Sequence, residues 1–172
     1  CIVAAVFAVS AVSLPVSSPA WADETRLDTL FADLRQAEQE DAIRIAREIE
    51  LELTKSGSAA ADLLLKRGAD ALETGDVATA IDHLTALTDH APGFAEGWFQ
   101  RAMAFARAEM FGPAIGNLER ALALEPRHYN AIAGLGGILY QINKFEMARD
   151  AFDLVLDIHP HHEDASEALQ SA

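Results

Sequence analysis

The stretch AEGWFQRAMAFARAEMFGPAIGNLERALALEPRH, residues 95–128, decides the fold, because its main features recur 34 positions earlier and 34 positions later. Proline shows the step most simply, since it stands at positions 92, 126 and 160. Five further columns keep the same step over three copies: Gly68, Ala102 and Gly136; Ala80, Ala114 and Ala148; Leu84, Leu118 and Phe152; Leu64, Trp98 and Ile132; Leu87, Ala121 and Val155. Six columns in register identify an internal repeat of the length used by helical arrays.

Each copy is predicted to be a pair of helices. In the first copy, apolar residues at helical spacing predict one helix over about 61–73 and another over about 77–90, with a turn at Thr74-Gly75-Asp76. The small residues allow the two helices to approach closely, and the large residue of the second helix is expected to fill the space between neighbouring units. The proline then ends the second helix, because it has no N–H to donate.

These columns resemble the tetratricopeptide repeat (TPR) family. Residues 95–128 match the family pattern best, through Trp98, Ala102, Phe105, Ala114, Leu118, Ala121 and Pro126. The resemblance covers residues 61–162 and implies an all-α protein, a right-handed α-solenoid of helix-turn-helix repeats. The repeats are predicted at 61–94, 95–128 and 129–162. Because this fold serves many partners, it indicates protein binding without naming the partner.

Helical segments flank the repeats on both sides. Residues 23–58 carry two amphipathic runs, which predict a helical hairpin that is either a degenerate repeat or a cap. Ser56-Gly57-Ser58 is expected to form a flexible joint before the regular array. Residues 163–172 are predicted to form a C-terminal capping helix. Stacked repeats need such ends, since an open terminal face would expose apolar surface.

Residues 1–22 differ sharply from the rest, because they contain no charged side chain. They combine an apolar stretch, Pro15 and the small-x-small sequence Ala20-Trp21-Ala22, which predicts a signal peptide that is incomplete at its N-terminus. We therefore expect an exported, periplasmic protein, and an uncleaved membrane anchor is the alternative. The net charge of −14 falls entirely on residues 23–172. It argues against nucleic acid or anionic lipid as a partner and favours basic or apolar partners.

The resemblance places the binding surface on the first helix of each unit, because these helices line a concave groove in tetratricopeptide arrays. An apolar strip with a polar margin is expected there, suited to an extended peptide or an amphipathic helix. Alternatively, some of these residues pack against the N-terminal hairpin folded back into the groove. The predicted groove residues are Leu65, Glu73, Glu96, Phe99, Met103, Arg107, Asn130, Tyr140 and Gln141, and Asp62 is a further inward position.

One ligand class of the family is not expected. Tetratricopeptide modules that bind the C-terminal carboxylates of cytosolic chaperones use Lys, Asn and Arg at defined groove positions. The matching positions here are Leu65, Ala69, Gln100, Asn130 and Gly134, none of which is a cation.

No catalytic arrangement stands out, so we predict a protein that is not an enzyme and that needs no cofactor. The cluster His159-Pro160-His161-His162 has metal-ligand residue types, although an exposed polar turn explains it more simply. The sequence thus favours a protein-binding scaffold of the cell envelope. A self-assembling repeat protein is the alternative, a weak homo-oligomer is left open, and metal binding at the His159–His162 turn comes last.

Overall fold

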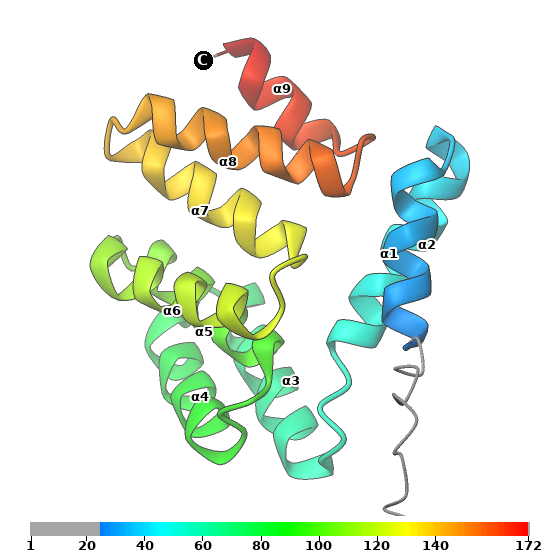
Figure 1. The fold of residues 1–172 in the computed structure, drawn as a ribbon. Coiled ribbons are helices and arrows are strands. Elements are labelled where there is room, and N and C mark those ends of the chain that lie inside the picture. Colours follow the sequence, from blue (N-terminus) through cyan, green and yellow to red (C-terminus); the bar gives the residue numbers. More distant parts are fainter. Residues whose placement is uncertain (1–24, 172) are drawn as a thin grey trace, which may run out of the picture.

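The computed structural model describes residues 25–171, which form nine α-helices and no strand (Figure 1). The predicted signal peptide at 1–22 lies outside the described residues. Among the described helices, none combines the length and the apolar character that crossing a membrane requires. The helices are α1 (Arg26–Gln36), α2 (Gln39–Leu53), α3 (Ala59–Glu73), α4 (Val77–His90), α5 (Ala95–Arg107), α6 (Phe111–Leu124), α7 (Tyr129–Gln141), α8 (Phe145–Ile158) and α9 (Glu163–Ser171).

The expected all-α solenoid is confirmed, since α3–α4, α5–α6 and α7–α8 form three consecutive helical pairs that stack on one another (Figure 1). The side chains of Ser58, Asp76 and His128 accept hydrogen bonds from backbone N–H groups and so cap α3, α4 and α7. The second helix of each pair ends two residues before the repeated proline. The turn inside each pair needs a positive φ, which Gly75 adopts at 79° and Asn143 at 60°.

Close packing between the helices of a pair depends on the small residues of the first helix. A Cβ atom on Gly68 would lie 2.5 Å from Leu84, and one on Gly136 would lie 2.8 Å from the ring of Phe152. The large residue of the second helix therefore packs against the first helix of its own unit. It also reaches the next unit, as expected, since Leu118 lies 3.8 Å from the Cβ position of Gly134. Leu87 reaches the next unit as well, 3.1 Å from the Cβ position of Gly97.

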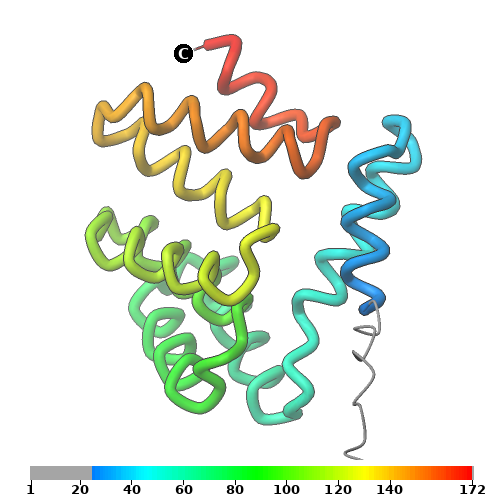
Figure 2. The backbone as a smooth tube through the Cα atoms, in the orientation of Figure 1, coloured from blue at the N-terminus to red at the C-terminus, as the bar shows by residue number. Residues whose placement is uncertain are grey.

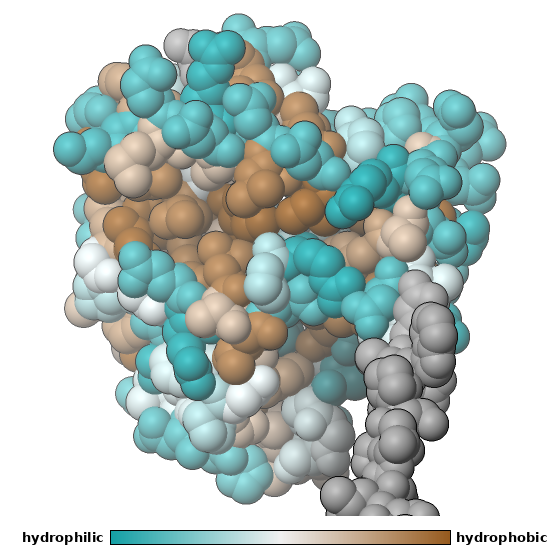
Figure 3. All heavy atoms as spheres, in the orientation of Figure 1, coloured by the Kyte–Doolittle hydropathy of each residue, from teal (hydrophilic) through white to brown (hydrophobic). Residues whose placement is uncertain are grey.

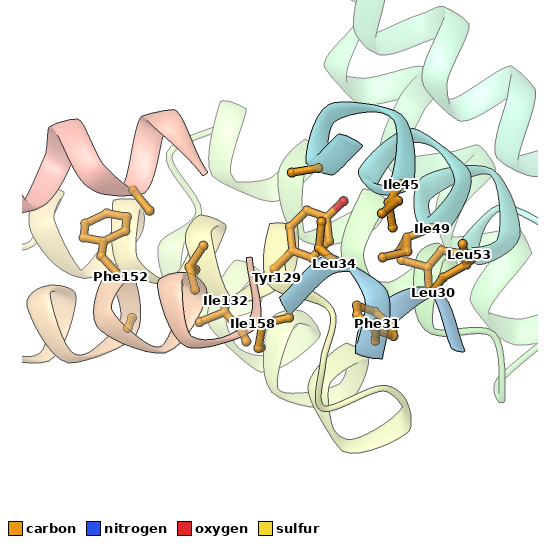
Figure 4. Packing of buried hydrophobic residues seen from close by; sticks show 14 of the residues in the cluster. Leu30, Phe31, Leu34, Ile45, Ile49, Leu53, Tyr129, Ile132, Phe152 and Ile158 are labelled. Carbon is orange, nitrogen blue, oxygen red and sulfur yellow. The ribbon is translucent and has the colours of Figure 1, made fainter. Parts of the chain in front are cut away.

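The hairpin formed by α1 and α2 packs against the third repeat, far along the sequence. Leu30, Phe31 and Leu34 of α1 belong to the same buried cluster as Tyr129 of α7 and Ile158 of α8. Figure 4 shows Tyr129 between the side chains of the third repeat on one side and those of the hairpin on the other. Figure 2 shows the chain leaving this hairpin and running along the array to reach α3.

Polar contacts join the same surfaces. Arg127 donates from Nη1 to Oδ1 of Asp28 at 2.6 Å, and its guanidinium lies 4.5 Å from the centre of the Phe31 ring. The Tyr129 hydroxyl donates to the carbonyl of Ala46 at 3.3 Å. Hydrogen bonds from Thr25 and then from Arg127 lower the pKa of Asp28 to about 2. The hairpin therefore lies beside the array, attached to its far end.

The last helix covers the other side of α8. Ala165 of α9 is fully buried, and Ala168 and Leu169 pack against the cluster that the hairpin and the third repeat share. The third repeat is thus covered both by a segment that precedes the array and by one that follows it.

Candidate functional site

Three adjoining hollows run along the inner helices of the array. The first has a volume of about 340 Å³ and lies between α3, α5 and the end of α2. The second, of about 320 Å³, lies between α5, α7 and α2, and the third, of about 420 Å³, lies between α3, α5 and the end of α7. Glu96 and Gln100 line the first and second hollows, and Phe99 and Gln100 line the second and third. The hollows therefore adjoin one another, and we call the three together the groove.

Seven of the nine predicted residues line this groove. They are Leu65, Glu96, Phe99, Met103, Arg107, Asn130 and Gln141. Glu73 and Tyr140 lie outside the three hollows. Tyr140 is 42% exposed, and its ring packs edge-on against Phe145 with 5.1 Å between ring centres.

A buried carboxylate forms part of the groove wall. Glu96 is only 6% exposed, and its two oxygens accept separate hydrogen bonds. Gln100 donates to Oε1 at 2.7 Å, and Nε2 of His128 lies 3.1 Å from Oε2. Because Nδ1 of His128 accepts from the N–H of Ala131, the proton of a neutral His128 sits on Nε2 and points to Glu96. The pair fastens α5 to the start of α7, so both groups are already engaged structurally.

The middle of the groove is apolar. The ring of Phe99 stacks at a tilt on His128, with 4.7 Å between ring centres. The methyl end of Met103 lies 2.8 Å from where a Cβ on Gly134 would be, so that glycine makes room for it. Arg107 closes one end, where its Nη1 donates to the carbonyl of Leu72 at 2.6 Å. A flexible methionine beside an aromatic ring suits apolar side chains of varied shape.

The hairpin supplies a second wall, which the sequence analysis did not assign to the site. Leu53 and Thr54, at the end of α2, line the second hollow together with Glu50. Oε1 of Glu50 accepts from Nδ2 of Asn130 at 3.2 Å. The alternative that groove residues contact a folded-back hairpin therefore holds for Asn130. No signal in the sequence pairs these two segments, because 80 residues separate them.

The histidine turn lies at the junction between hairpin and array. The rings of His159, His162 and Tyr129 contact one another edge-on, and Nδ1 of His159 is buried without a hydrogen-bond partner. Burial, with a smaller contribution from His162 and His161, lowers the pKa of His159 to about 4. Between residues 25 and 171, no three His, Cys, Asp or Glu side chains converge in a way that could hold a metal ion.

Apolar surface gathers on the face shown in Figure 3, where hydrophobic residues spread across the middle of the array and hydrophilic residues surround them. The edge of the hairpin borders this surface on one side. The face combines an apolar centre with a polar rim, the arrangement found where one protein contacts another.

Comparison with known proteins identifies the family. Two family models, each described as tetratricopeptide repeat, match residues 65–111 and 105–172. A TPR repeat-containing protein of Rhizobium etli is 34% identical over 145 residues, which cover 84% of this chain and 71% of that protein. The chain belongs to the tetratricopeptide repeat family. The family resemblance drawn from the repeated columns is thereby confirmed.

Solved tetratricopeptide structures share the fold. The first TPR of Spaghetti (RPAP3), bound to the HSP90 peptide SRMEEVD, is 26% identical with a TM-score of 0.64, over 66% of this chain and 90% of that one. MamA is 21% identical with a TM-score of 0.61, over 84% of this chain and 81% of that one. The match to MamA extends over more of the chain than the three repeats contain.

Proposed function

We propose that this chain is a non-catalytic scaffold of the bacterial cell envelope that binds a segment of another protein in its groove. The observation that carries the proposal is the row of three adjoining hollows, which Leu65, Phe99 and Met103 help to line. A groove that offers both apolar and hydrogen-bonding side chains accommodates an extended peptide or an amphipathic helix.

Peptide binding by structural neighbours supports this function class. The Spaghetti domain binds an HSP90 peptide, and the TPR2B domain of yeast Sti1, which is 18% identical with a TM-score of 0.62, was solved as a complex with Hsp70. The HSP90 peptide is rich in acidic residues. In this chain, Leu65, Gln100 and Asn130 line the groove at positions where carboxylate-binding modules carry cations or amides. We therefore propose a protein segment as the ligand, but not an acidic C-terminus.

The test is selection of binding peptides from a displayed random library on the purified protein, followed by affinity measurement. Phe99→Ala is expected to lower the affinity for the selected peptides by at least about tenfold, as truncation of a central aromatic anchor does. Tyr140→Ala is the comparison variant, since Tyr140 is an aromatic residue that does not line the three hollows.

Circular dichroism of both variants checks that the fold is intact, because Phe99 also packs on His128. If Phe99→Ala keeps full affinity in a folded protein, or if both variants lose affinity equally, the groove is not the binding surface.

Export is the second element of the proposal, and the charge-free segment 1–22 supports it. N-terminal sequencing of the protein from fractionated native cells tests it. A periplasmic protein that begins at Asp23 is the expected result. A full-length protein in the membrane fraction would favour the anchor, and a full-length cytoplasmic protein would contradict export.

A further inference from the structure

Three histidines of the turn between α8 and α9 lie where the hairpin meets the third repeat. Nε2 of His161 lies 3.0 Å from the carbonyl oxygen of Ala37, the residue that ends α1. The rings of His159 and His162 pack edge-on against Tyr129, with 5.3 and 5.8 Å between ring centres. Tyr129 in turn contacts both helices of the hairpin. The turn is therefore part of the surface that holds the hairpin.

Among the three, His159 is the ring whose surroundings cannot accept a positive charge. It is 7% exposed, and its Nδ1 has no hydrogen-bond partner. Protonation would turn Nδ1 into an N–H donor and place a charge on a buried ring, which costs far more than an unpartnered lone pair. His162 differs, because its Nδ1 already accepts from the backbone N–H of Ala165.

The neighbouring charged groups do not compensate for a proton on His159. The titratable residues that line a hollow of about 240 Å³ together with His159 are Glu50 of α2, Tyr129 of α7, His161 and His162 of the same turn, and Glu163 and Asp164 of α9. The three carboxylates are exposed, and none of them gives Nδ1 of His159 a hydrogen-bond partner. On the side of α1, the carboxylate of Asp28 is held by Arg127.

Release of the hairpin would change the surroundings of His159. Ala46 and Glu50 of α2 form one side of the hollow beside it, so their departure opens the ring to water. Its pKa, which burial lowers to about 4, should then return toward the ordinary 6.5. Between these two values the released form binds the proton more readily than the docked form. Each pH unit below 6.5 therefore favours release by up to about tenfold.

We propose that protonation of His159 releases the hairpin from the third repeat while the array stays folded. Release removes Glu50, Leu53 and Thr54 from the groove, where they line the second hollow. The array can persist, because two of its buried clusters contain no hairpin residue. The hairpin is thus an acid-sensitive wall of the groove, docked at neutral pH and released as the pH falls.

Amide hydrogen exchange between pH 7 and pH 5 tests the release, with protection corrected for the pH dependence of exchange in an unfolded chain. In the unchanged protein, protection of α1 and α2 should fall by up to about 30-fold between pH 6.5 and 5, while α4 keeps its protection. In His159→Phe the hairpin should keep its protection over this range, because that ring cannot be protonated. Carboxyl groups ordinarily titrate below pH 5 and so contribute little.

His90→Gln is the control variant, since His90 is exposed at the end of α4 and far from the hairpin in the chain. It should behave as the unchanged protein does. If the hairpin of His159→Phe loses protection in acid as strongly as the unchanged protein, the proposal is wrong. It is also wrong if α4 loses protection together with α1 and α2, because acid would then unfold the whole chain.

A second measurement decides the matter even if His159→Phe fails to dock its hairpin. If protonation favours release, release must raise the pKa of His159 by the same factor. Leu34→Asp should release the hairpin, because it places a charge at a fully buried position of α1. Titration of His159 by NMR is expected to give a pKa near 4 in the unchanged protein and a value closer to 6.5 in Leu34→Asp. Equal pKa values in the two proteins, with α4 still protected in both, would overturn the proposal.

Neither measurement involves a bound peptide, so this inference goes beyond the proposed function and does not depend on it. Peptide selection at pH 7, where the hairpin is docked, tests the proposed function separately.

Discussion

Gly136 and Gly137 are neighbours on α7, yet their surroundings are opposite. A Cβ on Gly136 would lie 2.8 Å from the rigid ring of Phe152, whereas one on Gly137 would meet no atom within 4 Å. Gly136 is therefore required by packing between the helices of the third unit. Gly137 lies on a free face, where the backbone freedom of glycine only weakens the helix.

Substituting alanine at the two positions should consequently change stability in opposite directions. Gly137→Ala is expected to raise the free energy of unfolding by about 1 kcal/mol, because alanine favours the helix. Gly136→Ala should lower it by about 1–3 kcal/mol through overpacking against Phe152. Chemical denaturation followed by circular dichroism measures both, and a stabilising Gly136→Ala would show that the ring moves aside without cost.

His159 should make the protein less stable in acid. Its pKa is about 4 in the folded state and 6.5 as an isolated side chain, so the unfolded chain binds the proton more readily between these values. The stability contributed by neutral His159 is fully present above pH 6.5 and is lost as the pH falls toward 4.

The measurement is the unfolding free energy of the unchanged protein and of His159→Phe across this pH range. Whatever their difference at neutral pH, the unchanged protein should lose more stability on acidification, since the variant lacks the titrating ring. If the unfolding free energies of the two proteins change with pH in parallel, His159 has the same pKa in the folded and the unfolded chain.

At the scale of elements, a few residues of the third unit hold the hairpin in its place. Tyr129 is 2% exposed and contacts Phe31 of α1 edge-on, while its hydroxyl reaches the backbone of α2. Tyr140 lies on the same helix but is 42% exposed. The two tyrosines therefore form a matched pair, one inside the hairpin junction and one outside it.

Tyr129→Ala should cost about 3–5 kcal/mol of stability, as truncation of large buried rings does, and should release the hairpin. Amide hydrogen exchange is expected to speed up in α1 and α2 and to stay unchanged in α4. Tyr140→Ala should leave exchange in the hairpin as it was. Persistent protection of α1 in Tyr129→Ala would mean that Arg127 and the contacts around it hold the hairpin by themselves.

The helical pairs could be predicted from sequence, whereas the place of the hairpin could not. The predicted second helix of the first copy, at 77–90, has the bounds of α4, because proline, glycine and apolar spacing act within a few residues. Helical register also placed Leu65, Phe99 and Met103 on the groove side. For α1, the amphipathic pattern indicates which face is buried but not what covers it, so its contacts with Tyr129 and Ile158 were beyond prediction.

The groove could be predicted only in part, and the reason is the same. Tyr140 faces inward by register, and register does not foresee that its ring packs edge-on against Phe145. The bond between Glu96 and His128 joins successive units and depends on how they stack, which register alone does not give. Glu50 entered the site only through the folded-back hairpin.

At the scale of the whole molecule, the buried residues fall into clusters that do not follow chain order. One cluster, around Leu84 and Leu87, joins the first repeat to Ala104 of the second, and another, around Ala114 and Leu118, joins the second repeat to the third. The hairpin shares the third cluster with the third repeat and α9. Contacts within the array are local, while those of the hairpin span up to 124 residues, as between Ala37 and His161.

This arrangement has a consequence for how the chain is made. The hairpin is synthesised before the three repeats, but the surface that buries Leu34 and Phe31 belongs to the third of them and to α9. Each repeat can pack as it emerges, whereas the hairpin must wait, with its apolar face uncovered, until the third repeat has been made. Such an interval invites aggregation or capture by chaperones, and the distant closure slows the final step of folding. The segment that completes the groove is therefore synthesised before the array and reaches its place after it.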